Sequence, residues 1–195
     1  MTSQTQYWNR LIQPGIVALV GAGGKTTVLS KLVEYGRLQG QPIVVTTTTQ
    51  LYESQVAQYE PIYTKDINDV DEYCTKRIQQ GYCGAWFNGI TRTKVDAVDC
   101  ESIDGLSALH PNWQIVVEAD GAKEKWLKAP KHTEPVIPSQ TKTTIGVVNL
   151  QMLGASLDED HVHNLELVQS IVHREEGAIV TPHMLAQIVL HKQGL

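Results

Sequence analysis

The chain has few cysteines, no long apolar run and no excess of basic residues. Its three cysteines, Cys74, Cys83 and Cys100, are an odd number in no spacing typical of a metal site. This usage predicts reduced thiols and does not fit a disulfide framework. No apolar run approaches the length of a membrane span, and the polar N-terminal residues lack the apolar core of a signal peptide. We therefore expect a cytoplasmic protein with no membrane partner.

The charge balance excludes a second class of partner. The formal net charge of the 195 residues is −5, so the chain has no basic surface of the kind that binds nucleic acid. We expect no nucleic-acid partner. The length suits one domain with a substantial core.

The most informative stretch is residues 15–27, Gly-Ile-Val-Ala-Leu-Val-Gly-Ala-Gly-Gly-Lys-Thr-Thr. Ile16–Val20 is an uninterrupted apolar run, typical of a strand covered on both faces. A glycine turn follows, and the apolar residues from 28 to 38 then recur on one helical face. The first turn of such a helix offers unpaired N–H groups and the positive end of the helix dipole. This arrangement predicts an anion site, most readily for nucleotide phosphates.

The turn differs from the standard P-loop, G-x-x-x-x-G-K-[ST], because Leu19 occupies the position of the first glycine. The shorter spacing G-x-x-G-K-T-T resembles the ATP loop of Mur ligases and folylpolyglutamate synthases. We expect Lys25 to contact the β- and γ-phosphates and the Thr26 hydroxyl to bind Mg²⁺. The predicted ligand-binding residues of the turn are Gly21, Ala22, Gly23, Gly24, Lys25, Thr26 and Thr27. The alternative is an ordinary strand–turn–helix in which the glycines serve packing.

Two carboxylates end the next buried strand, in Gln-Ile-Val-Val-Glu-Ala-Asp-Gly at residues 114–121. Alternation along the strand puts Glu118 and Asp120 on the same side. P-loop proteins place the acid that holds Mg²⁺, and in some cases the acid that activates water, at this position. We expect Asp120 to bind the metal, with Glu118 as the second metal candidate and as the group that orients a water. Lys25, Glu118 and Asp120 are thus the predicted catalytic residues.

Two further segments have both a structural and a functional interpretation. Four threonines, residues 46–49, follow the strand at 42–46. They end a strand or line the crevice where α/β sheets bind ligands, with Thr48 as the candidate. Residues 123–138 form a proline-rich loop with four lysines, in which Lys123 and Lys128 contact a γ-phosphate or an anionic substrate, or the loop is simply a solvated charged segment.

The remaining pattern predicts a three-layer, P-loop NTPase-like α/β fold in a single domain, residues 1–195. Its mostly parallel sheet has helices on both faces. The expected helices cover residues 5–13, 66–80, 102–110 and 161–174, and a further helix begins at residue 181. Further strands cover residues 83–87, 144–149 and 177–180. Asn88-Gly89 is the clearest hairpin turn, with residues 90–98 as the returning strand of a small antiparallel insertion. The histidines at 161, 163, 173, 183 and 191 lack metal-site spacing and are interpreted as surface or capping residues.

Six motifs occur here in one order: residues 20–27, Val-Thr-Thr-Thr-Thr at 45–49, Glu-Ala-Asp-Gly at 118–121, Leu-Lys-Ala-Pro at 127–130, His-Thr-Glu-Pro-Val-Ile-Pro at 132–138 and Val-His at 162–163. Together they resemble the YqeC family, described as accessory proteins of selenium-dependent molybdenum hydroxylases. The resemblance covers nearly the whole chain from residue 15 onward. It implies a P-loop nucleotide-binding fold and a role in maturing a molybdoenzyme.

The chain departs from that family at three places. Ala122-Lys123 and His163-Asn164 stand where the family tends to have an arginine, which removes two bidentate phosphate contacts. The resemblance also implies residues beyond the match to Gly194-Leu195, toward a strand with an Asn-Lys-x-Asp-like element. A chain shortened at its C-terminus would have an exposed sheet edge and no guanine-reading motif, so we expect ATP as the nucleotide rather than GTP.

These features predict a Mg²⁺-dependent protein that binds and hydrolyses ATP or another NTP. Its role would be in maturation of a selenium-dependent molybdenum hydroxylase or its cofactor, with that enzyme or a cofactor-maturation protein as partner. One alternative is a nucleotide-gated binding module or chaperone without turnover. Another is a Mur-like ATP-dependent ligase, although 195 residues leave little room for the extra domains of such ligases.

Overall fold

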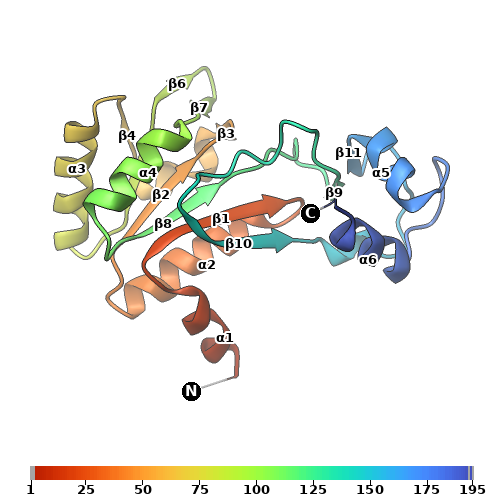
Figure 1. Cartoon of the computed structure of the whole chain (residues 1–195), viewed down its shortest axis with the longest axis horizontal. Coiled ribbons are helices and arrows are strands. Elements are labelled where there is room, and N and C mark those ends of the chain that lie inside the picture. Colours follow the sequence, from red (N-terminus) through yellow and green to blue (C-terminus); the bar gives the residue numbers. More distant parts are fainter. Residues whose placement is uncertain (1–2, 193, 195) are drawn as a thin grey trace.

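A six-stranded parallel sheet forms the centre of the protein (Figure 1). The computed structural model describes residues 3–192 and residue 194. In spatial order the strands are β10 (Thr141–Val147), β1 (Gly15–Gly21), β8 (Gln114–Glu118), β2 (Ile43–Thr47), β5 (Gly84–Phe87) and β4 (Ile62–Tyr63). Every neighbouring pair is parallel. The carboxyl ends of the strands therefore meet at one edge, where α/β sheets bind their ligands.

Helices cover both faces of this sheet, as the apolar pattern of β1 requires. Val17 and Leu19 face one core cluster, whereas Ile16, Ala18 and Val20 face the other. The first face is covered by α2 (Lys25–Leu38), with α1 (Ser3–Leu11) beside it; α3 (Ile67–Gln79) and α4 (Cys100–Leu109) cover the second. The predicted three-layer α/β fold is confirmed.

A small antiparallel sheet is inserted after β2 and β5, in the order β3 (Leu51–Tyr52), β7 (Lys94–Asp96) and β6 (Gly89–Thr91). The predicted insertion is confirmed, but its predicted turn is wrong. The chain reverses at Arg92-Thr93, where Arg92 has φ of 58°, and not at Asn88-Gly89. The reason is that β5 already pairs with β2 and β4 on its two edges, so it has no edge for an antiparallel partner. Two 3₁₀ turns, η1 (Glu53–Gln55) and η2 (Ala57–Tyr59), follow β3.

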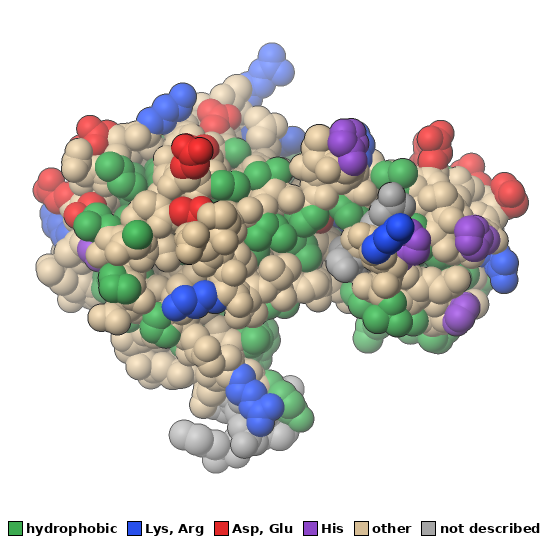
Figure 2. All heavy atoms as spheres, viewed as in Figure 1, with side chains coloured by type: hydrophobic (Ala, Val, Ile, Leu, Met, Phe, Trp, Pro, Cys, Tyr) green, Lys and Arg blue, Asp and Glu red, His purple; other side chains and the backbone are tan. Residues whose placement is uncertain are grey.

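The C-terminal part of the chain forms a smaller lobe beside the carboxyl edge of the sheet (Figures 1 and 2). It contains β9 (Leu127–Lys128), η3 (Leu150–Met152), β11 (Val162–His163), α5 (Leu165–Val172) and α6 (Pro182–Leu190). Its buried residues form a separate core cluster, which includes Leu127, Met152, Val168 and Leu185. The parallel pairing of β9 with β11 connects this lobe to the loop after β8.

Three predictions about this half of the chain are wrong. The helix expected over 161–174 is split, because residues 162–163 pair as a strand and α5 starts only after Asn164, whose φ is 59°. The strand expected at 177–180 is a single bridge between Ser156 and Ile179. The strand expected to be buried at 144–149 is β10, which is partly exposed because it is an edge strand with β1 as its one partner in the described sheet. No helix among the described residues is long and apolar enough to cross a membrane.

The packing of α3 against β5 gives a first test of this architecture. A Cβ added to Gly84 would lie 2.7 Å from the Cys74 sulfur and 3.2 Å from a Val44 methyl carbon, whereas one added to Gly105 on α4 would meet nothing within 4 Å. Gly84→Ala should therefore lower the free energy of unfolding by about 1–3 kcal/mol through overpacking. Gly105→Ala should raise it by up to about 1 kcal/mol through helix propensity. Urea unfolding of both variants measures these opposite changes, and equal effects would contradict the packing described here.

Candidate functional site

The glycine turn between β1 and α2 has the backbone of an anion cradle. Gly21, Gly23 and Gly24 have φ of 99°, 68° and 140°, values that favour glycine. A Cβ on Gly23 would also lie 2.5 Å from the Cβ of Asn149, so this position needs glycine for space as well. Gly24 caps α2 without a side chain. The first N–H groups of α2 therefore have no intrahelical acceptor, and they point the positive end of its dipole at the turn.

Lys25 lies at the bottom of this turn, with 5% of its surface exposed. Its ammonium donates to the carbonyl oxygen of Gly21 at 2.7 Å and lies 3.5 Å from Oε1 of Glu118. Burial lowers the pKa of Lys25 below its ordinary value, while the carboxylates of Glu118 and Asp120 act in the opposite direction. The cation is thus buried, next to the glycine turn, and within ion-pair distance of one carboxylate.

Glu118 ends β8 directly opposite Lys25 and has an oxygen atom without a partner. Its Oε2 is buried and accepts no hydrogen bond from any described residue. Burial raises the pKa of this carboxyl, although Lys25 lowers it in part. An unpaired buried oxygen costs free energy unless a ligand, a cation or a water satisfies it. Glu118 therefore fits a divalent cation or a bound water better than a purely structural role.

Asp120 is already occupied by protein groups. One of its oxygens accepts from the N–H of Gly21 at 3.1 Å, and the other is paired with the ammonium of Lys128. Lys128 is fully buried, and its other two donors go to the carbonyl oxygen of Gly121 at 2.7 Å and to Glu134 at 2.9 Å. An ammonium has three donors, so Lys128 has none left for a ligand. The prediction that Lys128 contacts the ligand finds no support in this packing.

The hydroxyls of three threonines at the end of β2 are used within the protein. Thr46 donates to the carbonyl of Trp86, Thr47 to that of Glu118, and Thr48 to that of Val136 at 2.6 Å. The structural interpretation of these threonines is therefore the better one, including for Thr48. Thr26 is different, because its hydroxyl accepts a hydrogen bond from the Gln55 amide at 3.3 Å and faces the cavity.

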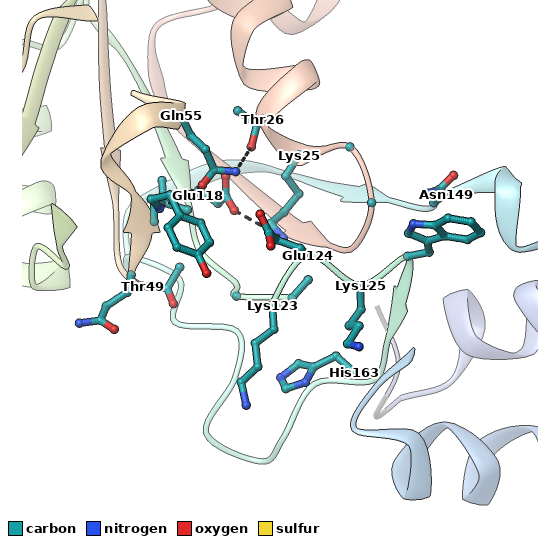
Figure 3. A pocket seen from close by; sticks show the side chains of 18 of the residues that line it. Lys25, Thr26, Thr49, Gln55, Glu118, Lys123, Glu124, Lys125, Asn149 and His163 are labelled. Atoms are coloured by element: carbon teal, nitrogen blue, oxygen red, sulfur yellow. Dashed lines mark hydrogen bonds and ion pairs between the residues drawn. The ribbon is translucent and has the colours of Figure 1, made fainter. Parts of the chain in front are cut away.

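A cavity of about 750 Å³ lies beside the glycine turn at the carboxyl edge of the sheet (Figure 3). That volume suits a small-molecule ligand. Of the predicted site residues, the cavity brings together Gly23, Gly24, Lys25, Thr26, Glu118 and Lys123. The other predicted residues, Gly21, Ala22, Thr27, Thr48, Asp120 and Lys128, do not line it.

Several lining residues were not predicted from the sequence. They come from the insertion, from the end of β10 and from the smaller lobe: Tyr52, Gln55, Lys94, Asn149, Trp126, Glu134 and His163. The Val-His motif at 162–163 is the sequence signal for His163, although its spacing from the other histidines favours a surface or capping residue. The register of β9 with β11 places it beside Lys128. Within the described residues no three His, Cys, Asp or Glu side chains cluster as a metal cage.

The buried ion pairs of Lys128 generate a stability prediction. Lys128→Met removes the cation that compensates Asp120 and Glu134, so we expect a loss of about 3–5 kcal/mol in the free energy of unfolding. Lys131→Met, an exposed lysine on the same loop, is the matched control and should change it little. Urea unfolding at constant ionic strength measures both. Equal stability of the two variants would contradict the central role of Lys128.

Comparison with known proteins places the chain in a family. The family model described as "YqeC protein" matches residues 17–166, which include the glycine turn, both strand-end carboxylates, the loop after them and His163. A protein of Escherichia coli (strain K12) described as "Uncharacterized protein YqeC" is 28% identical over 183 residues, which cover 93% of this chain and 70% of that protein. No solved structure matches the chain. The chain is a member of the YqeC protein family.

Proposed function

We propose that this protein binds a nucleoside triphosphate, with ATP as the expected nucleotide, together with Mg²⁺. One observation carries the proposal: a glycine cradle at a helix N-terminus faces a buried lysine, and an unpartnered carboxylate oxygen of Glu118 lies beside that lysine. Phosphates need the cradle and the cation, and Mg²⁺ prefers oxygen ligands. Because Mg²⁺ usually takes one or two protein oxygens and completes its shell with phosphates and waters, no closed protein cage is needed.

In this proposal each residue has a defined task. Lys25 and the turn amides from residue 23 onward would hold the phosphates, because the N–H groups of Gly21 and Ala22 donate to Asp120 and Val147. The hydroxyl of Thr26 and the free oxygen of Glu118 would hold the metal or a metal-bound water. Bound Mg²⁺ would neutralise the charge that develops on the phosphates during transfer. Asp120 takes a supporting position: its bonds to Gly21 and Lys128 hold the turn in place.

We propose hydrolysis of the nucleotide as the activity, with Glu118 as the acid that orients a water. The specific observation in favour of a second candidate, a nucleotide-gated module without turnover, is that both strand-end carboxylates are paired with lysines. We also propose a role in maturation of a selenium-dependent molybdenum hydroxylase or its cofactor. The resemblance of the motifs to the YqeC family supports this role in the pathway, but it identifies no particular reaction.

Removal of Lys25 tests the phosphate site. Calorimetric titration with Mg²⁺ and ATP, GTP or CTP should show binding to the wild-type protein, with ATP preferred. Lys25→Ala should weaken that binding at least about tenfold, because it removes a charged hydrogen-bond donor. Lys31→Ala, an exposed lysine on the same helix, is the control and should bind as the wild type does. Binding of no nucleotide by folded wild-type protein would refute the proposal.

Replacement of Glu118 separates hydrolysis from binding. Glu118→Gln keeps the size of the side chain and should retain nucleotide binding within about threefold, while phosphate release falls by roughly a hundredfold or more. Glu101→Gln, on the exposed surface of α4, controls for the loss of one charge. Phosphate release is measured under saturating Mg²⁺ and nucleotide. Release by the wild-type protein at the uncatalysed rate, despite tight binding, would favour the non-hydrolysing module.

A further inference from the structure

The cavity has a second wall, which the nucleotide proposal does not use. It consists of the turn at residues 121–126 and of His163 on β11. Figure 3 shows Lys123, Lys125 and His163 gathered on the side of the cavity away from the α2 helix, where Lys123 and His163 lie next to each other. Because this wall approaches the smaller lobe and the phosphate turn belongs to the larger one, the cavity lies where the two lobes meet.

Lys123 is held in an unusual backbone conformation. Its φ is 47°, and that of Glu124 is 62°, which is uncommon for residues other than glycine. Such strain often marks ligand-binding segments. A hydrogen bond from the N–H of Lys125 to the carbonyl of Ala122 closes the turn at 2.9 Å. In the described part of the chain, no carboxylate lies within 4.0 Å of the Lys123 ammonium, so this cation is available to a ligand.

His163 is half-buried and also without a partner. Neither ring nitrogen forms a hydrogen bond with any described residue, although the ring lines the cavity. Burial lowers the pKa of the imidazole below its ordinary value, and the charges of Lys128 and Lys123 lower it further. A neutral imidazole offers one N–H donor and one acceptor nitrogen. Because the ring lines the cavity and neither nitrogen has a partner among the described residues, both nitrogens are available to a ligand there.

The charge of this wall favours an anion. Four lysines and three glutamates line the cavity. Of the glutamates, Glu118 faces Lys25 and Glu134 is paired with the buried Lys128, so their charges are compensated. Glu124 alone opposes Lys94, Lys123 and Lys125. A net positive wall in a chain of net charge −5 is suited to an anionic ligand.

We propose that Lys123 and His163 form a subsite for the oxyanion group, phosphate or carboxylate, of a second small-molecule substrate bound beside the nucleotide. The inference rests on the proposed nucleotide site, which it extends from one ligand to two. Lys25 and the turn amides serve the nucleotide phosphates from one wall, and Lys123 supplies the charge and His163 the N–H donor from the other. The half-exposed Trp126 extends the same wall and gives the body of the substrate an apolar surface.

Inorganic phosphate is the probe for this subsite. It is titrated at constant ionic strength into protein labelled at the histidine ring nitrogens, and the His163 signals are assigned with His163→Gln. We expect a saturable change of the His163 signals. Lys123→Ala should weaken this response at least about tenfold, because a charged hydrogen bond is lost. Lys65→Ala, which removes an exposed lysine outside the cavity, should leave it unchanged.

The Lys25→Ala variant separates this subsite from the phosphate turn. Persistence of the His163 response in Lys25→Ala supports an anion subsite separate from the phosphate turn. If the His163 response persists but the wild-type protein binds no nucleotide, the proposed function fails and the anion subsite stands. Loss of the response in Lys25→Ala means that the anion occupies the phosphate turn and overturns the proposal. Equal weakening by Lys123→Ala and Lys65→Ala, or no response of His163 at all, also overturns it.

Discussion

The buried ammonium of Lys128 joins the parts of this protein on which the site depends. It lies between Asp120 at the end of β8 and Glu134 in the following loop, and it also holds the carbonyl of Gly121. Asp120 in turn accepts from the N–H of Gly21. Because Lys128 belongs to β9, which pairs with β11, the same charge cluster connects the glycine turn to the smaller lobe. Removal of either the cation or a carboxylate from such a buried cluster leaves an uncompensated charge, which strongly destabilises the fold.

This arrangement divides the charged residues of the cavity edge into two groups. Lys128, Asp120 and Glu134 compensate one another and serve the architecture. Lys25 and Glu118 are buried and His163 is half-buried, and the free groups among them are a carboxylate oxygen of Glu118 and two imidazole nitrogens of His163, while the Lys25 ammonium lies 3.5 Å from Glu118. Lys123 is exposed and lines the same cavity, with no carboxylate partner among the described residues. The buried unpaired oxygen of Glu118 costs folding free energy, which a bound ligand, cation or water recovers.

The local signals in the sequence predicted most of the elements because they do not depend on distant contacts. Asp66 and Thr181 cap their helices as expected, with hydrogen bonds to the N–H groups of Asn68 and Met184. The buried strand Gly15–Gly21 and the positive φ values of its glycine turn follow from the apolar run and the glycines. The predictions were wrong where strand pairing between distant segments determines the local structure. Asn88-Gly89 is not a hairpin turn because both edges of β5 pair with other strands. Residues 162–163 form a strand because they pair with β9.

The sequence by itself determined the fold class, the family and the two halves of the proposed phosphate site, the turn at Lys25 and the acid strand ending in Glu118 and Asp120. Only the tertiary structure decided how these acids differ. Alternation along the strand treats Glu118 and Asp120 alike, but Lys128 reaches Asp120 and leaves an oxygen of Glu118 free. It also decided that His163 faces the cavity. The physical reason is that hydrogen-bond saturation and burial depend on which distant side chains arrive at the same place, and no local pattern encodes that.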